Sequence, residues 1–402
     1  MTSVDPQSAR QIAARLASRR SFLRLAGLGA AGIGLAACGS GTTTATSSTS
    51  AAGSSAAGSS AAGSSAAESS AAASSAAGSA AAVSTAIAPG SNGDISVQLS
   101  WIKNIEFGGE YFADSKGYYT RAGFSAVDLV SGPVDSADAL VAAGNITVGI
   151  SAPDATARFI SEQGAPLKVI GSTFQKNPFC ILSLEEGTPI KSVADLAGKK
   201  IGIQAGTNQQ IFDGFLKANK VDPASLTQVV VQYEPTPLTE KKVDGFMAFL
   251  TNEPFLVKNQ GFTPVTLSFA ENGLPLTSET FTVSQETIDT KRDMLKAFLL
   301  AEILGWTDAV ADPAGTAKLA VTEYGKDLKL DLAGQTEQAK AQNALIVSAD
   351  TKANGLFTLT PELQSQIIAA LGNIGITITA GELFDLSMLN EIYQDNPALI
   401  TG

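Results

Sequence analysis

The residues able to do chemistry in this chain of 402 residues are carboxylates, amides and aromatic rings, because histidine is absent. Without histidine the chain cannot form Ser-His-Asp or Cys-His catalytic groups, and it lacks the usual zinc ligand. The two cysteines, Cys38 and Cys180, are too few for a thiolate metal cluster. No close pair of carboxylates that could serve a hydrolase is legible. The residue types therefore favour ligand binding over catalysis, with no metal and no cofactor.

The first candidate binding residues follow a predicted strand that ends at Trp101. The indole ring could stack on a flat ligand, which contributes about 0.5–1.5 kcal/mol beyond burial, or it could pack in the core. Asn104 could offer an amide donor and acceptor to ring nitrogens, or it could cap a helix. Phe107 and Tyr111 on the same segment, and Phe174 at the end of a later strand, complete this aromatic set.

A second group lies where predicted helices begin. Ser151 and Asp154 stand at the start of a helix, so each could contact a ligand or cap that helix. The stretch QAGTNQQ contains Gly206 and Thr207 and exposes backbone N–H groups at the start of the next helix. Such N–H groups can bind an anion or a carbonyl oxygen, although Thr207 and Asn208 could simply cap the helix. No P-loop lysine follows, so a phosphate site is not favoured.

Two polar pairs in the second half of the chain complete the candidates: Tyr233 with Glu234, and Asn252 with Glu253. Each pair follows an apolar run that is typical of a buried strand. A glutamate beside a flat ring could accept two hydrogen bonds from neighbouring donors on that ring. The alternative is a solvated acid, or one with a structural role at a hinge.

Alternating strands and helices are predicted to position these residues. The first series has strands at 94–101, 124–130, 146–150, 166–174 and 178–184, and helices at 107–123, 136–144 and 153–164. The second series has strands at 200–204, 226–233 and 262–270, a helix from 208, and a strand that runs into a helix over 243–261. Beyond residue 281 the pattern is mostly helical. This alternation predicts an α/β fold with mainly parallel sheets covered by helices.

The two series predict two lobes with a cleft between them. We expect lobe 1 to comprise 94–184 and 278–402, and lobe 2 to be the inserted segment 185–277. In open α/β sheets ligands bind outside the carboxyl ends of the strands. The candidate residues above stand at such ends, so the predicted binding site is the cleft. The pattern leaves open whether the helices after Tyr324 contribute to this site or only brace it.

The N-terminal segment has the features of an export signal. Arg19 and Arg20 precede a short apolar run that ends at Cys38, and this run is too short to span a bilayer. The arginine pair resembles a twin-arginine signal, and LAAC at 35–38 resembles the lipobox of bacterial lipoproteins, in which the cysteine is lipidated. Residues 39–93, rich in Ala, Gly and Ser, are predicted to be an unstructured linker with an r.m.s. span of roughly 40 Å. We therefore expect residues 1–38 to direct a lipid anchor.

The net charge and the two cysteines limit the classes of partner that the chain could bind. The chain carries a net charge of −11, and removing five Arg and one Asp with residues 1–37, a net +4, leaves −15. Such an acidic surface disfavours nucleic acid and anionic lipid as partners. With Cys38 lipidated, Cys180 has no partner for a disulfide and is predicted to be a buried, inert thiol. Lys241 and Lys242 are predicted to lie in a solvated turn, and Trp306 in the core.

Five stretches in order resemble the solute-binding lipoproteins of ABC importers for thiamine-pyrimidine precursors, sulfonates, nitrate and riboflavin. They are WIKNIEFGGEYFADSKGYY, LVAAGNITVGISAPD, SVADLAGKKIGIQAGT, KKVDGFMAFLTNEP and GWTDAVADPAGTA. Pyrimidine-type members often carry W-x-P-N-x-x-H-A-G; here Trp101 and Asn104 match, whereas Lys103 replaces the proline and Phe107 the histidine. TNEP at 251–254 agrees with the pyrimidine-type branch. The resemblance implies a two-lobed periplasmic-binding-protein fold that closes on its ligand by hinge motion.

The resemblance implies an extracytoplasmic, lipid-anchored monomer on the outer face of the bacterial membrane. It would bind a small aromatic heterocycle, similar to a thiamine pyrimidine precursor, and deliver it to an ABC permease. Phe107 in place of a polar residue would make the pocket more apolar and favour a larger aromatic ligand. The alternatives are a riboflavin or flavin-like ligand, an aliphatic sulfonate or nitrate, and an enzyme similar to the fungal pyrimidine synthases. Those enzymes use a histidine and a cysteine-rich motif, which this chain lacks.

Overall fold

The computed structural model describes residue 88 and residues 90–400, so the predicted signal at 1–38 and most of the predicted linker lie outside the described residues. The first strand, β1 (Gly93–Gln98), begins inside the range predicted to be linker. Just before it, the backbone N–H of Asn92 donates to the carbonyl of Gly123 over 2.9 Å. The linker prediction is therefore wrong for its last residues, because they are tied to the first sheet.

The first of two five-stranded sheets has the order β2-β1-β3-β10-β4. The strands that join β1 are β2 (Phe124–Val130), β3 (Val148–Ser151), β4 (Leu167–Phe174) and β10 (Ser278–Ser284). β1 pairs in parallel with β2 and β3, whereas β10 is antiparallel to both of its neighbours. The α/β prediction is confirmed, with one antiparallel strand in an otherwise parallel sheet.

The second sheet has the order β7-β6-β8-β5-β9 and again contains one antiparallel strand, β5. Its strands are β5 (Phe179–Leu184), β6 (Lys200–Gln204), β7 (Thr227–Val231), β8 (Gly245–Phe249) and β9 (Pro264–Ser268). The lobe boundary predicted at residue 184 placed β5 in lobe 1, which is wrong. β4 and β5 are both almost wholly buried, so their sequences do not show that the chain crosses between sheets at 175–178.

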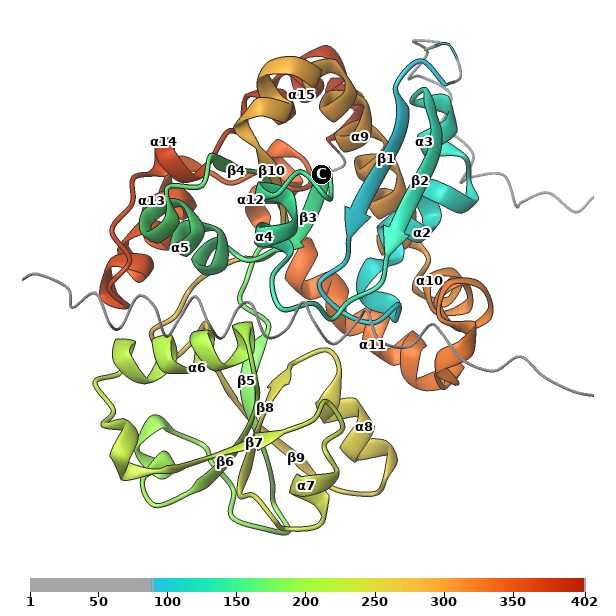
Figure 1. Ribbon diagram of the computed structural model, residues 1–402. Coiled ribbons are helices and arrows are strands. Elements are labelled where there is room, and N and C mark those ends of the chain that lie inside the picture. Colours follow the sequence, from blue (N-terminus) through green and yellow to red (C-terminus); the bar gives the residue numbers. More distant parts are fainter. Residues whose placement is uncertain (1–87, 89, 401–402) are drawn as a thin grey trace, which may run out of the picture. The chain divides into compact units, whose positions relative to one another are not determined.

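Helices cover both sheets (Figure 1). Those of the first series are α2 (Gly108–Ser115), α3 (Tyr118–Arg121), α4 (Ala137–Ala142) and α5 (Pro153–Gln163). Those of the second series are α6 (Thr207–Ala218), α7 (Thr236–Thr239) and α8 (Glu253–Asn259). The helix predicted over 107–123 is two helices, because Gly117 adopts a left-handed conformation (φ 67°) between α2 and α3.

The chain after β10 is mostly helical, as predicted, but the predicted start at residue 281 is wrong because 281–284 belong to β10. It comprises α9 (Gln285–Ala311), α10 (Pro313–Leu319), α11 (Leu332–Ile346), α12 (Ala349–Asn354), α13 (Pro361–Asn373), α14 (Ala380–Leu383) and α15 (Ser387–Asp395). α9 packs along α2 in lobe 1, and α13 packs on α6 in lobe 2. The Lys217 ammonium at the end of α6 donates to the carbonyl of Ile374 over 3.0 Å. The C-terminal helices thus brace both lobes.

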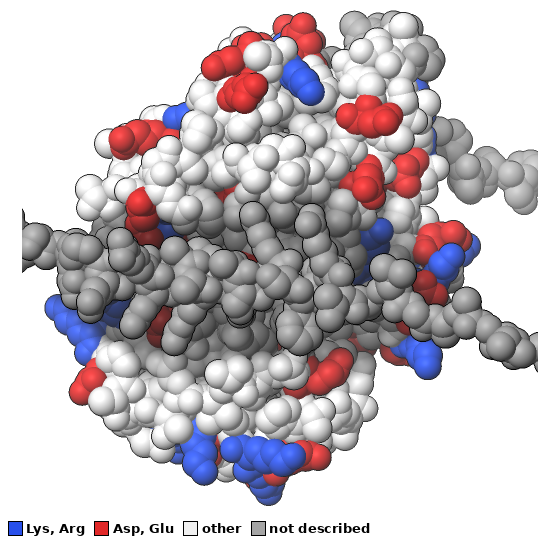
Figure 2. Space-filling view, viewed as in Figure 1, with Lys and Arg blue, Asp and Glu red and all other residues white. Residues whose placement is uncertain are grey.

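Short helical turns complete the structure. The 3₁₀ turns are η1 (Ile105–Phe107), η2 (Val193–Leu196), η3 (Pro223–Ser225), η5 (Lys326–Leu328) and η6 (Pro397–Leu399), and η4 (Ala320–Tyr324) is a π-helical turn. Within the described ranges, no helix has the length and apolar character needed to cross a bilayer. Acidic and basic side chains are interspersed over the described part of the face shown in Figure 2.

Candidate functional site

A pocket lies between the two lobes, which belong to the same compact unit of the chain. It is bordered by the ends of β1, β3, β6 and β8, and by the segments that follow β1 and β7. The cavity has a volume of about 170 Å³. Since one water needs roughly 10–15 Å³ of such space, the pocket can hold a molecule of about ten or more non-hydrogen atoms. The carboxyl ends of parallel strands therefore form the site, as the fold predicts.

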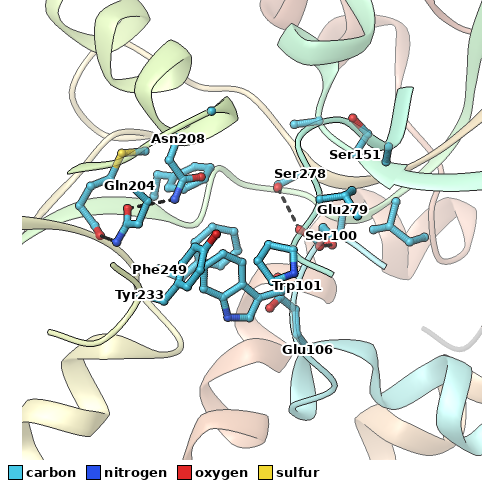
Figure 3. A pocket seen from close by; sticks show the side chains of 18 of the residues that line it. Ser100, Trp101, Glu106, Ser151, Gln204, Asn208, Tyr233, Phe249, Ser278 and Glu279 are labelled. Carbon is cyan, nitrogen blue, oxygen red and sulfur yellow. Dashed lines mark hydrogen bonds between the residues drawn. The ribbon is translucent and has the colours of Figure 1, made fainter. Parts of the chain in front are cut away.

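Aromatic rings from both lobes meet at this pocket (Figure 3). The rings of Trp101, after β1, and Tyr233, after β7, lie edge to face with their centroids 4.6 Å apart. Phe179 and Phe249, at the paired ends of β5 and β8, form a second edge-to-face pair at 4.5 Å. Tyr233 is 42% exposed, so part of its ring faces solvent at the pocket mouth. These rings give the pocket flat apolar walls suited to a planar ligand.

Three glutamates with buried side chains also line the pocket. Glu106 lies in η1, Glu279 in β10 and Glu253 at the start of α8. The Ser100 hydroxyl donates to Glu279 Oε2 over 2.7 Å. Glu253 accepts from the Phe249 backbone N–H over 2.8 Å, whereas Glu106 Oε1 is buried without a hydrogen-bond partner.

Burial changes the titration of all three carboxyls. It raises the pKa of Glu253 to about 7, against the lowering effect of the hydrogen bond from Phe249. It also raises the pKa of Glu279 to about 7, against hydrogen bonds from Ser100 and Glu106. For Glu106, burial and then the nearby charge of Glu279 raise the pKa well above its ordinary value. Burial thus favours the neutral form of all three carboxyls, and the nearby charge of Glu279 favours it further at Glu106.

A hydrogen-bonded network surrounds a fourth acid on the lobe 1 side of the pocket. Asp138 in α4 accepts from the Ser151 hydroxyl over 2.5 Å and from the Thr156 hydroxyl over 2.6 Å. Burial raises the pKa of Asp138, and these two hydrogen bonds act in the opposite direction. Ser151 and Asp138 both line the pocket. Ser151 thus holds a carboxyl in place and does not cap α5, which begins at Pro153.

The lobe 2 side of the pocket offers neutral amide groups at the start of α6. The Asn208 side chain donates to Gln204 Oε1 over 3.0 Å, and Gln204 donates to the Met247 carbonyl over 3.2 Å. Gly206 is the residue before α6 and lines the pocket beside them. No lysine or arginine is among the described residues that line the pocket, and Lys103 lies outside this set. The site is therefore rich in hydrogen-bond acceptors and lacks fixed cations.

Six of the predicted site residues line the pocket: Trp101, Ser151, Gly206, Tyr233, Asn252 and Glu253. Six others do not, and the side chain of Thr207 lies outside the described part of the structure. Asn104 caps η1 by accepting from the Glu106 backbone N–H over 2.9 Å. Phe107, Tyr111 and Phe174 are core residues that are at most 1% exposed.

Asp154 and Glu234 also lie outside the pocket lining. Asp154 is buried in the first turn of α5, and burial raises its pKa to about 6. Thr207 is the first residue of α6, and Glu234 is exposed beside Tyr233. Their neighbours in sequence reach the pocket. The expectation that ligands bind at the carboxyl ends of strands therefore located the segments that line the pocket, but not which side chains point into it.

Sequence reasoning missed several polar lining residues: Ser100, Glu106, Asp138, Gln204, Asn208, Ser278 and Glu279. Ser100 and Glu106 lie in the stretch SWIKNIEF, and Gln204 and Asn208 in QAGTNQQ, so the signal for these four was their position after a strand. Glu279 gives no local signal. It adopts a left-handed backbone (φ 52°) inside β10 and reaches the pocket from a distant part of the chain.

Comparison with known proteins places this chain in a family. The chain belongs to the NMT1/THI5-like family, whose model matches residues 104–316. A riboflavin-binding protein, RibY of Chloroflexus aurantiacus, is 25% identical over 54% of this chain and 63% of its own length. A Haemophilus influenzae protein named for thiamine biosynthesis is 26% identical over 52% of this chain and 66% of its own. Each match thus spans less than two thirds of the relative.

Solved structures confirm the periplasmic-binding-protein fold. The alkanesulfonate-binding protein SsuA of Xanthomonas axonopodis, bound to MOPS, superimposes with a TM-score of 0.54 at 16% identity, over 72% of this chain and 98% of its own. The fold also occurs in a desulfurization enzyme, DSZB, with a TM-score of 0.50 at 13% identity, over 75% of this chain and 99% of its own. At such identities the likeness shows the fold alone.

Proposed function

We propose that this protein is the extracytoplasmic substrate-binding component of an ABC importer and that it binds a small aromatic heterocycle with hydrogen-bond donors. The observation that carries this proposal is the pocket between the lobes. Its walls are the rings of Trp101, Tyr233 and Phe249, and its polar groups are buried carboxyls and amides. A flat ring held between such walls would place its N–H groups against acceptors. Closure of the lobes around it would give the permease a distinct shape to recognise.

The ligand class that we favour is a thiamine pyrimidine precursor or a similar aminopyrimidine. Glu253 is the first residue of α8. One of its carboxyl oxygens accepts from the Phe249 backbone N–H and the other accepts from the Asn252 side-chain amide over 3.2 Å. A carboxyl fixed in this way beside an aromatic wall suits an amino group on a ring. The second candidate is a flavin, which the riboflavin-binding relative supports.

The polar groups of the pocket argue against an anionic ligand. Sulfonate and nitrate require cations or clustered N–H donors, whereas the described lining contains buried carboxyls and no lysine or arginine. An enzyme of the histidine-dependent type is excluded by the absence of histidine from the chain. Lipid attachment at Cys38 and delivery to a permease are parts of the same proposal. A Cys38→Ala variant that remained in the membrane fraction would exclude the anchor.

A thermal-shift panel tests the ligand class. The wild-type protein is heated with an aminopyrimidine thiamine precursor, riboflavin, taurine or nitrate, each over a range of concentrations. We expect the midpoint of unfolding (Tm) to rise with one of the heterocycles and to remain unchanged with taurine and nitrate. A rise with taurine or nitrate, and none with either heterocycle, would reject the proposal.

A further inference from the structure

The carboxyls of Glu106 and Glu279 form a close pair on the lobe 1 side of the pocket. Each affects the titration of the other through its charge or a hydrogen bond between the two side chains. The two residues are only 6% and 4% exposed, yet both line the pocket. Glu106 Oε1 is a buried acceptor without a hydrogen-bond partner. A donor brought by a ligand would satisfy this oxygen.

The surroundings of this pair are acidic or neutral on every side. The groups that face it are Ser100 after β1, Asn104 before η1, Ser278 in β10, Glu253 in α8, and Glu110 and Tyr111 in α2, with Glu302 of α9 beyond Glu110. No lysine or arginine is among the described residues that line the pocket around this pair. The described lining of the pocket therefore offers no positive charge to balance a buried carboxylate.

Such a pair has two ways to avoid an uncompensated charge. It can hold protons, because burial and a like charge both favour the neutral form. Alternatively, one carboxyl can ionise when a ligand brings a cation to pair with it, because a buried carboxylate without a partner is strongly unfavourable. Binding of a cation and binding of a proton then compete at the same carboxyl group.

We propose that Glu106 and Glu279 form a subsite for a cationic planar group of the ligand, such as an amidinium or a protonated amino-heterocycle, and that this group displaces one proton. This inference rests on the proposed function, because it names the charge of the heterocycle that the same pocket binds. The Glu279 O–H bond breaks and its proton passes to solvent. The ligand N–H groups then donate to the Glu279 carboxylate and to Glu106 Oε1, while Glu106 keeps its own proton.

Three flat probes of similar size and different charge test the subsite: benzamidine (cationic), benzamide (neutral) and benzenesulfonate (anionic). Titration calorimetry at pH 6, 7 and 8, in two buffers that differ in ionisation enthalpy, gives the affinity and the number of protons released. Because the pKa of Glu279 is about 7, the affinity for benzamidine should rise roughly tenfold from pH 6 to pH 8. Proton release should accompany binding. Benzamide should bind at least tenfold more weakly at pH 8.

Two variants locate the effect. Glu279→Gln should lower the benzamidine affinity at pH 8 by at least tenfold and sharply reduce its dependence on pH, because the proton of Glu279 is gone and only Glu253 still titrates near pH 7 in this pocket. The matched control is Glu302→Gln, which removes a fully buried carboxyl of α9 that does not line the pocket. This control should retain the wild-type affinity and proton release. If Glu279→Gln does not fold, the comparison of the three probes on the wild-type protein still tests the cation subsite.

The outcomes separate this inference from the proposed function. Equal affinity for benzamide and benzamidine, affinity that is independent of pH, or no benzamidine binding at millimolar concentrations would each overturn the cation subsite. The proposed function would survive any of these results if the aminopyrimidine or riboflavin still raised the Tm. Preference for benzenesulfonate, together with no response to either heterocycle, would reject both.

Discussion

Trp101 and Tyr233 come from different lobes, so their contact changes whenever the lobes move apart. The two rings meet edge to face, which leaves the face of one ring free to contact a ligand. Trp101 is also one of only two tryptophans in the chain; the other, Trp306, is 1% exposed in the core of lobe 1. Binding in the pocket should therefore be visible as a change in the fluorescence of one identified residue.

Replacing Trp101 by alanine tests this role directly. The substitution removes the aromatic wall and its contact with Tyr233, so we expect ligand affinity to fall by at least about tenfold, or 1.4 kcal/mol. Trp306→Phe is the control, because it removes the other fluorophore without changing the pocket lining. It should bind normally and retain the ligand-induced fluorescence change. Unchanged affinity in Trp101→Ala would show that this ring only packs between the lobes.

A second residue-scale prediction concerns Glu302, which is fully buried in α9 and accepts a hydrogen bond from Tyr119. Burial raises the pKa of Glu302 to about 8, above the ordinary value of 4.5 that applies to the unfolded chain. The folded state therefore binds this proton more tightly. The stability that this tighter proton binding by Glu302 contributes is fully present below about pH 4.5 and is lost as the pH rises through about 8.

Glu302→Gln keeps the shape of the protonated side chain and removes its titration. We expect the Tm of the wild-type protein to fall between pH 6 and pH 9, and the fall to be smaller by roughly 5 °C in the variant. Some decline should remain, because burial also raises the pKa of Glu106 and Glu110 in the same lobe. Calorimetry across this pH range measures the difference. Parallel pH profiles for the two proteins would contradict the prediction.

At the scale of elements, the pair α2 and α9 shows how closely lobe 1 is packed. Gly109 of α2 faces the Trp306 indole, and a Cβ atom at this position would overlap the ring. Gly109→Ala should therefore destabilise the protein by about 1–3 kcal/mol through overpacking. Gly372→Ala in α13 is the matched control, because a Cβ there meets no atom within 4 Å. The control should be neutral or slightly stabilising, since alanine favours helix. Equal Tm values would contradict this account of the interface.

Most strands were predictable, because they are short and largely apolar runs bounded by turn residues. β10 (SETFTVS) was missed, because its sequence is mostly polar and its burial comes from its place inside the first sheet. The boundaries were less predictable where packing decides them. Phe107 and Tyr111 are four residues apart, so the helical turn that begins at η1 directs both side chains into the core. Phe107 was predicted to be a ligand contact because it replaces the histidine of the pyrimidine-type motif, and Tyr111 was predicted with it on the same segment. Periodicity shows that two side chains share a face, but not whether that face meets a core or a cavity.

The candidate site was predictable to the extent that it depends on topology. Ends of parallel strands meet at one edge, which brought Trp101, Tyr233 and Asn252 correctly to the pocket. The pair of Glu106 and Glu279 was not predictable, because it joins η1 to a strand far along the chain. Nothing in the local sequence of Glu279 distinguishes it from a solvated acid. Its burial follows only from the way β10 returns to the first sheet.

At the scale of the whole described chain, the C-terminal segment decides how independent the lobes are. A single hydrophobic cluster contains Val169 of β4, Phe212 of α6 and Ile367 of α13. It therefore joins lobe 1, lobe 2 and the C-terminal helices in one core. No pocket-lining residue of the described chain comes after Glu279. The C-terminal helices thus support the pocket from behind and leave its lining to the two sheets.

This shared core predicts that the two lobes unfold together. We expect one calorimetric transition with equal calorimetric and van't Hoff enthalpies, because neither lobe can lose its core without exposing that of the other. Ile367→Ala truncates a fully buried side chain of the shared cluster. It should lower the free energy of unfolding by about 2–5 kcal/mol and leave a single transition. Leu332→Ala, at a site that is 48% exposed, is the control and should change the Tm little. Two resolved transitions, with only one displaced by Ile367→Ala, would show that the lobes fold separately. With a single transition, a ligand bound in the pocket should raise the Tm of the whole unit. With two transitions, the lobes could move apart at a hinge without disturbing the packing of α13.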